Sequence, residues 1–283
     1  MTVELTEEST SRFVELEQGK VHYNEAGEGH PVILIHGSGA GATGWANFSS
    51  NIGPLAEKFH VLAVDCIGWG RSDAATADQY DHMAMIVQFM DALGLEKAAL
   101  VGNSMGGMVA LGVAARYPER VSHLITMGPG AFVNIPSMFG PGDGPSEGIK
   151  ILLEGYRNPT KETMKKLCEI MAFDQRFATD ELAQMRSDAA RARPDHLENG
   201  LASFMSGGPV RNQVTVEEAM TISAPSLLIH GRDDRVVHFE NTLRLVSTIK
   251  NSRAVLMNQC GHWAQIEHAA EFNRLVADFV ENN

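Results

Sequence analysis

The ten residues AALVGNSMGG, at positions 98–107, join a short apolar run to a Gly-x-Ser-x-Gly motif, and a helix-like stretch follows as far as residue 117. A sharp strand-to-helix turn brings backbone close to the serine on both sides, so its flanking positions favour residues without a Cβ atom. The start of a helix also supplies free backbone N–H groups beside the Ser104 oxygen, where negative charge develops during acyl transfer. The motif therefore makes Ser104 a candidate nucleophile. The alternative is a glycine-rich turn that contains a serine by chance.

Apolar runs of four or five residues recur along the chain and are too short and too continuous for amphipathic helices. Between the later runs, residues 81–93 and 267–280 carry apolar side chains at helical spacing. Strands that alternate with helices indicate a mostly parallel sheet covered on both faces. The sequence therefore predicts an α/β protein with strands over residues 12–16, 20–23, 32–36, 61–65, 98–101, 123–127, 226–230 and 253–257.

The alternation is interrupted once, between residues 129 and 224, where no convincing strand pattern is present. A segment rich in glycine and proline leads into helical patterns over residues 149–156, 161–173, 180–193 and 196–205. A helical insertion of this size after a sheet strand is typical of a lid or cap. We therefore expect a core domain of residues 1–134 and 211–283 and a cap domain of residues 135–210.

Methionine and phenylalanine are frequent in this helical insertion. We expect most of them to pack the cap on itself and a minority to form an adaptable apolar pocket over Ser104. The residues concerned are Met138, Phe139, Met164, Met171, Phe173, Met185, Phe204 and Met205.

The composition excludes several classes of partner. A formal net charge of −12, with no run of lysine and arginine, argues against a nucleic-acid surface or a basic membrane-binding patch. The N-terminus is acidic, and no apolar stretch approaches the ~20 residues that a membrane helix needs. Cys66, Cys168 and Cys260 lack the paired spacing of a zinc site or a disulfide framework. We expect a cytoplasmic protein without a metal, whose partner is a small molecule.

A serine hydroxyl is a poor nucleophile until a base accepts its proton, so a histidine and an acid should follow behind later strands. Asp233 and Asp234 follow the seventh apolar run, and His262 follows the eighth directly after a glycine. The chain order serine, acid, histidine is the order found in α/β-hydrolases. We prefer Asp234 as the acid because it lies three residues after the glycine of its loop, with Asp233 as the alternative.

The oxyanion of acyl transfer needs two hydrogen-bond donors. One is the backbone N–H of Met105, directly after the nucleophile, and the other should come from a loop behind an earlier strand. The sequence HGSGAG, at residues 36–41, is that loop, and its glycines permit close approach of the backbone to a substrate. The N–H near Ser38 or Gly39 is the predicted second donor.

The same loop contains a motif of a different protein class. Residues 39–44, GAGATG, fit the Gly-x-Gly-x-x-Gly fingerprint of dinucleotide binding, and Asp65 lies about where a ribose-binding acid would. That fingerprint should begin right at the end of the strand, whereas residues 36–38 intervene. A dehydrogenase would also leave Ser104, Asp234 and His262 without a role. We therefore favour a hydrolase and expect no cofactor.

With these motifs, the chain resembles the α/β-hydrolase superfamily over nearly its whole length. The segments that look like the meta-cleavage product hydrolases are HGSG at 36–39, GNSMGG at 102–107, the cap segment 186–197 and CGHWAQ at 260–265. Those enzymes hydrolyse a carbon–carbon bond in 2-hydroxy-6-oxo-hexa-2,4-dienoates, the ring-fission products of catechol degradation. The resemblance implies a mostly parallel eight-stranded sheet flanked by helices, a helical cap inserted after the sixth strand, and a homo-oligomer.

The resemblance also implies a role for each residue of a catalytic triad. Ser104 would be the nucleophile, His262 the proton shuttle and Asp234 the acid that orients the imidazole. A dienol carboxylate must ketonise before its carbon–carbon bond can break, because the departing electrons need a carbonyl to receive them. Direct attack by water, with Ser104 in a supporting role, remains an alternative to a covalent acyl-enzyme.

Substrate-binding residues are implied in the same way. Ser38, Asn103 and Trp263 fall on the family's polar-pocket positions, Asn47 is expected to join them, and Arg186 falls on the position of an arginine that binds the substrate carboxylate. An anionic dienoate bound to a negatively charged protein needs a local cation, since distant charges are screened beyond ~8 Å at physiological salt. Each residue also has a simpler role as an alternative. Asn103 could only stabilise the turn, Trp263 could only pack in the core, and Arg186 could be one more charge in contact with solvent.

The sequence pattern also fits other proteins of this fold to differing degrees. A carboxylesterase would use the same triad beneath an apolar cap pocket. A non-catalytic binding protein of the same fold is disfavoured by the intact serine, histidine and acid. A haloalkane dehalogenase is disfavoured because its chemistry uses a carboxylate where this chain has Ser104.

Overall fold

Eight strands form one sheet in the order β1-β2-β4-β3-β5-β6-β7-β8 in the computed structural model, which describes residues 5–132, 138–139, 144–205 and 213–283. The pairs β1–β2 and β2–β4 are antiparallel, and β4, β3, β5, β6, β7 and β8 pair in parallel. Each strand expected from the sequence is present, so the predicted fold class is confirmed. The strands are β1 Ser11–Leu16, β2 Gly19–Ala26, β3 His30–Ile35, β4 Phe59–Val64, β5 Ala98–Asn103, β6 Val121–Met127, β7 Ser226–Gly231 and β8 Ser252–Met257.

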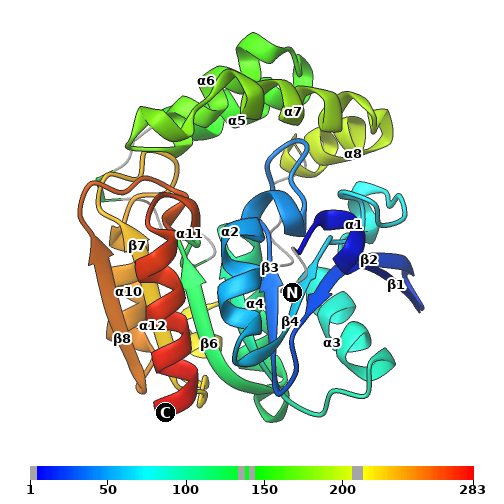
Figure 1. The fold of residues 1–283 in the computed structure, drawn as a ribbon. Helices are drawn as coiled ribbons and strands as arrows, with labels where there is room; N and C mark the ends of the chain where they lie inside the picture. The colour runs from blue at the N-terminus through cyan, green and yellow to red at the C-terminus, as the bar shows by residue number, and fades with distance from the viewer. Residues whose placement is uncertain (1–4, 133–137, 140–143, 206–212) are drawn as a thin grey trace.

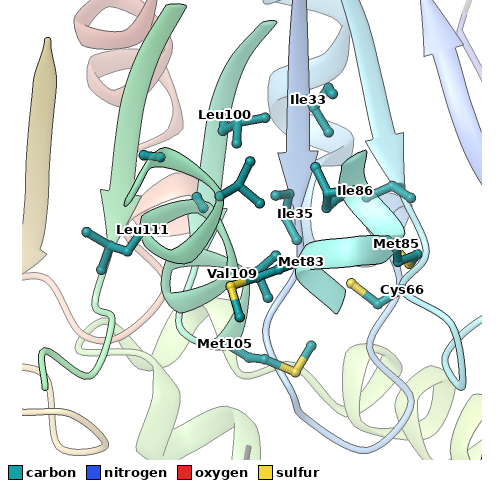
Figure 2. Close-up of a cluster of buried hydrophobic side chains, with 14 of the residues drawn as sticks. Ile33, Ile35, Cys66, Met83, Met85, Ile86, Leu100, Met105, Val109 and Leu111 are labelled. Atoms are coloured by element: carbon teal, nitrogen blue, oxygen red, sulfur yellow. The ribbon is translucent and has the colours of Figure 1, made fainter. Parts of the chain in front are cut away.

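The central strands are buried on both faces, which explains why they are continuously apolar in sequence. Alternate residues of β3 point into two separate cores. Ile33 and Ile35 pack in the core on one face of the sheet, as Figure 2 shows. Val32 and Leu34 pack in the core on the opposite face. The sheet is therefore the middle layer of a three-layer structure.

Helices cover both faces of this sheet (Figure 1). On the face with Ile33 the core includes residues of α3, His82–Ala92, and α4, Met105–Arg116, and on the other face residues of α2, Gly44–Ala56, and α12, Ala269–Asn282. The core also contains the helices α1 Glu7–Thr10, α9 Val216–Met220, α10 Glu240–Thr248 and α11 Ala264–Glu267, with short 3₁₀ turns η1 Ala77–Gln79 and η2 Pro118–Arg120.

Among the described residues between β6 and β7, four helices form a group that we name the cap: α5 Glu147–Arg157, α6 Lys161–Met171, α7 Asp180–Arg191 and α8 Pro194–Met205, with the 3₁₀ turn η3 Gln175–Phe177. Figure 1 shows them as a layer across the ends of the strands. The side chains of Ser146, Thr160 and Thr179 cap the N-termini of α5, α6 and α7. The domain boundaries expected at 134/135 and 210/211 lie outside the described residues.

The expectation that most methionines and phenylalanines pack the cap on itself is wrong. Met164 and Met171 are buried, but five others are exposed by 43 to 76% of their surface: Met138, Phe139, Phe173, Met185 and Met205. The cap is one layer of helices whose inner side packs against core residues such as Val236 and Trp263. Since no second layer covers the outer side among the described residues, apolar side chains there stay in contact with water.

Candidate active site

Ser104 lies in the sharp turn between β5 and α4. It adopts φ 54° and ψ −115°, a conformation that non-glycine residues rarely occupy. Its backbone N–H donates to Met127 O at 2.8 Å. A Cβ atom at Gly102 would lie 2.2 Å from Gly106 O, and one at Gly106 would lie 2.1 Å from Ile35 O. The turn therefore requires glycine at both positions, as the motif predicted.

The loops after β7 and β8 bring an acid and a histidine together. Asp234 Oδ2 lies 2.7 Å from His262 Nδ1, and both side chains are buried. The backbone N–H of His262 donates to Met171 O at 2.7 Å, which ties this loop to α6 of the cap. His262 and Ser104 both line one cavity. The arrangement is suited to a histidine that exchanges protons with the serine, with the acid holding the imidazole by its other nitrogen.

The carboxylate of Asp234 is buried and fully engaged. Its Oδ1 accepts from the N–H groups of Val236 at 2.8 Å and Val237 at 3.0 Å. Burial alone would raise the pKa of Asp234, but the charges of His262 and His230 and hydrogen bonds from them hold this pKa well below its usual range. The acid is therefore ionised at neutral pH.

Sequence reasoning missed His230, whose Nε2 lies 3.2 Å from Asp234 Oδ2 and 2.9 Å from Val237 O. A histidine at the end of an otherwise apolar strand, four residues before the acid, was the available signal. The alternative acid, Asp233, does not meet the imidazole. Its carboxylate lies 3.9 Å from Arg232 Nε, and its backbone N–H donates to Cys260 O.

The loop predicted to supply an oxyanion donor lies beside Ser104. A Cβ atom at Gly37 would be 3.3 Å from Ser104 Cβ. Ser38 and Gly39 both line the cavity with Ser104. Met105, the other predicted donor residue, is the first residue of α4, where backbone N–H groups have no partner within the helix. Its side chain lines an adjacent small chamber rather than the cavity itself.

Asp65, the residue that resembled a ribose-binding acid, braces this region instead. Its Oδ1 accepts from the N–H of Gly44 at 2.7 Å, and its Oδ2 accepts from the N–H of Arg71 at 2.9 Å and lies 2.9 Å from His22 Nδ1. Its carboxylate thus joins the start of α2 to the loop after β4. These contacts engage both of its oxygens and give Asp65 a structural role.

Arg186 of α7 is 2% exposed, and its side chain points at the same cavity as Ser104. Its guanidinium carbon lies 4.6 Å from the ring centroid of Trp263. Nε and Nη2 have no hydrogen-bond partner among the described residues. Burial lowers the pKa of Arg186. A buried cation that stacks on an aromatic face and has two nitrogens without a hydrogen-bond partner among the described residues favours an anionic ligand.

Asn103 and Asn47 differ in the number of hydrogen bonds that their amide groups donate within the protein. The Nδ2 group of Asn103 donates to Met127 O and His262 O, each at 3.2 Å, so this side chain joins the serine turn to the histidine loop. Asn47 donates from Nδ2 to Thr43 O at 3.0 Å. Both line the cavity. Their carbonyl oxygens are the groups through which a ligand could be bound.

The cavity brings eight of the predicted site residues together: Ser38, Gly39, Asn47, Asn103, Ser104, Arg186, His262 and Trp263. Leu152, Leu167 and Met171 of the cap also line it, and no sequence signal distinguished them from other apolar residues of the insertion. Its volume of about 20 Å³ accommodates a water molecule.

Within the described ranges, no cluster of three or more histidine, cysteine or acidic side chains could hold a metal ion. The same part of the chain contains no helix that is both long and apolar enough to cross a membrane. Cys66, Cys168 and Cys260 are buried free thiols, and burial raises the pKa of each.

Comparisons with known proteins agree with this geometry. Residues 30–269 match the family described as alpha/beta hydrolase fold. The 2-hydroxy-6-oxononadienedioate/2-hydroxy-6-oxononatrienedioate hydrolase of Paraburkholderia phymatum is 44% identical, with 99% of this chain and 98% of the relative covered. The 2-hydroxy-6-oxo-6-phenylhexa-2,4-dienoate hydrolase of Comamonas testosteroni is 42% identical, with 98% of each covered.

A solved structure of similar fold is the meta-cleavage product hydrolase CumD of Pseudomonas fluorescens IP01, complexed with acetates. It is 34% identical, aligns over 95% of this chain and 97% of its own, and gives a TM-score of 0.84. The resemblance seen in the sequence motifs is therefore confirmed over the whole length. The chain belongs to the α/β-hydrolase family and, within it, to the meta-cleavage product hydrolases.

Proposed function

We propose that this protein hydrolyses the carbon–carbon bond between C5 and C6 of a 2-hydroxy-6-oxo-hexa-2,4-dienoate. The observation that carries the proposal is Arg186, a buried guanidinium whose Nε and Nη2 have no hydrogen-bond partner in the described part of the chain, beside the cavity that Ser104 and His262 line. The names of the relatives, which are hydrolases of such dienoates, support the same substrate class.

Arg186 and Trp263 bind the carboxylate end of the substrate in this proposal. A guanidinium paired with a carboxylate forms charge-assisted hydrogen bonds, which are stronger in a site that excludes water. Ser38, Asn47 and Asn103 supply the remaining polar contacts. This binding aligns the chain of the dienoate so that its C6 carbonyl lies next to Ser104.

Proton transfer comes first. The 2-hydroxy group loses its proton and C5 gains one with the help of His262, so the dienol becomes a ketone at C2. Only this keto form has a carbonyl, conjugated to C5, that can accept the electrons of the breaking bond.

Ser104 then attacks C6, and its proton passes to His262 while Asp234 stabilises the imidazolium. The C6 oxyanion accepts hydrogen bonds from the N–H of Met105 and from the N–H of Ser38 or Gly39. Breaking the C5–C6 bond releases a 2-hydroxy-2,4-dienoate, and water hydrolyses the acyl-enzyme to a carboxylic acid. Direct attack by water on C6, with Ser104 in a supporting role, gives the same products.

Substrate enters between the cap and the core in this proposal, because residues of both line the cavity. The cap domain of this proposal comprises residues 135–210, and the core domain residues 1–134 and 211–283. The proposal also includes a homo-oligomer, which the resemblance to the family implies, and a location in the cytoplasm, which the acidic N-terminus and the unpaired cysteines favour.

To test the reaction, the purified protein is assayed with coloured dienoates that carry a methyl, isopropyl or phenyl group on C6, and with nitrophenyl esters in parallel. We expect loss of visible absorbance with at least one dienoate and a kcat/KM above that for any ester. The dienoate that is consumed fastest identifies the C6 substituent. Ester hydrolysis without dienoate cleavage would identify a carboxylesterase instead.

Ser104→Ala tests the covalent route. We expect kcat on the best dienoate to fall by about 10³-fold or more, because removal of a nucleophile leaves only binding and oxyanion stabilisation. A burst of product equal to the enzyme concentration should accompany acyl-enzyme formation in the unaltered protein. Retention of most of the turnover by Ser104→Ala would eliminate the covalent route and favour attack by water.

A further inference from the structure

Tyr156, on α5 of the cap, reaches into the loop predicted to hold the oxyanion. Its hydroxyl donates a hydrogen bond to the backbone carbonyl of Ser38. The side chain is 3% exposed, and its ring packs against His196, at 5.2 Å between centroids, and Phe204, at 5.8 Å. A residue of the cap therefore fixes the backbone of a core loop.

The atom that Tyr156 contacts matters because the carbonyl of Ser38 and the N–H of Gly39 belong to one planar peptide unit. The preceding peptide unit is held in a similar way. We call such a hydrogen bond, from a buried side chain to a peptide carbonyl, a brace. His36 Nδ1 lies 2.7 Å from Gly37 O, whose peptide partner is the N–H of Ser38, and His36 Nε2 accepts from the N–H of Cys66 at 3.0 Å. Both candidate oxyanion donors are thus held at the opposite end of their peptide by a buried side chain.

Two physical effects follow from such a brace. A hydrogen bond at the carbonyl fixes the rotation of the peptide plane, in a loop whose glycines would otherwise allow many orientations. It also polarises the amide, which makes the N–H at the other end a better donor. His36 supplies its brace from the core, whereas Tyr156 supplies its brace only while the cap is seated on the core.

We propose that Tyr156 is a positioning residue for the oxyanion hole, acting through the carbonyl of Ser38, so that seating of the cap completes the hole. The proposal rests on the proposed function only for the attack of Ser104 on a carbonyl carbon. It applies to esters as well as to dienoates.

The test replaces Tyr156 by phenylalanine, which removes the hydroxyl and keeps the ring. Loss of a whole oxyanion donor costs about 10²- to 10³-fold in kcat, so loss of one brace should cost about tenfold, on nitrophenyl acetate and on dienoates alike. An alkyl boronic acid, which forms a tetrahedral adduct with the serine, should bind about tenfold more weakly. The KM for nitrophenyl acetate and the affinity for a 2-hydroxy-2,4-dienoate product should stay within about twofold, because neither depends on the oxyanion.

Two further variants separate positioning from general packing. Tyr80→Phe is the matched control, because its buried hydroxyl has no hydrogen-bond partner among the described residues, and it should leave kcat and boronate affinity unchanged. Gly200→Ala keeps the phenol but adds a methyl group whose carbon would lie 2.3 Å from the Tyr156 ring, so it should reproduce the loss in kcat and boronate affinity.

Unchanged kcat and boronate affinity in Tyr156→Phe would overturn the proposal, as would an equal weakening of boronate and product binding. If Tyr156→Phe does not fold, the same readouts on Gly200→Ala decide the matter. If the unaltered protein cleaves esters but no dienoate, the proposed function fails while the ester and boronate measurements still test Tyr156.

Discussion

Two charged side chains of the site, Asp234 in the core and Arg186 in the cap, are both buried but differ in how their charges are compensated. Asp234 is 7% exposed and is surrounded by two backbone N–H groups and two histidines. Arg186 is 2% exposed, and the described residues give its Nε and Nη2 no hydrogen-bond partner. Its guanidinium stacks on the face of Trp263.

The difference shows that the charge of Asp234 is compensated within the protein, whereas the charge of Arg186 would be compensated by an anionic ligand. A buried charge costs free energy unless it is paired, so the protein alone stabilises the charge of Asp234 but not that of Arg186. Asp234 should therefore serve every substrate that reaches Ser104, whereas Arg186 should matter only for anionic substrates.

Asp234→Asn should lower kcat by about 10⁴-fold on dienoates and on neutral esters to the same extent, because the imidazole loses the acid that orients and stabilises it. Steady-state kinetics on both substrate classes measure the effect. Asp233→Asn is the matched control and should retain nearly all activity, since Asp233 has no contact with His262. A large loss in Asp233→Asn would mean that the wrong acid has been assigned.

Arg186→Gln should lower kcat/KM on dienoates by about 10- to 100-fold, which corresponds to the loss of a charge-assisted hydrogen bond in a buried site. The loss on neutral nitrophenyl esters should be less than about threefold. Arg191→Gln serves as the control, because Arg191 is exposed on the same helix and pairs with Asp188. Equal losses on both substrate classes would contradict a role in carboxylate binding.

Arg186→Met should raise the free energy of unfolding of the ligand-free protein by about 1–3 kcal/mol, since it replaces a buried charge without a carboxylate partner by an apolar chain of similar length. Urea denaturation at neutral pH measures the change. Arg191→Met should change stability by less than about 0.5 kcal/mol. A destabilised Arg186→Met would show that the contact between Arg186 and Trp263 outweighs the cost of burying the charge.

Much of the site could be predicted because its signals are local. The glycines around Ser104 are required by backbone contacts within a few residues and with the neighbouring strand β3. Ser104, Asp234 and His262 each follow a strand of the parallel sheet. Because the ends of parallel strands meet at one edge of the sheet, Asp234 and His262 were expected to meet. The choice between Asp233 and Asp234 depended on which side chain turns toward the imidazole, and the structure decided it.

The eight strands, the serine turn and the cap helices could be predicted because continuous apolar runs, glycines and helical spacing act over short stretches of chain. Only the folded chain showed that Arg186 is buried, that His230 contacts the acid, that Tyr156 reaches Ser38, and that Met185 and Met205 are exposed. The burial of Arg186 and the exposure of Met185 and Met205 depend on the rotation of a helix about its axis. The contact of Tyr156 with Ser38 joins residues 118 apart in the sequence. Such contacts are fixed by packing of the whole cap against the core, for which no short stretch of sequence carries a signal.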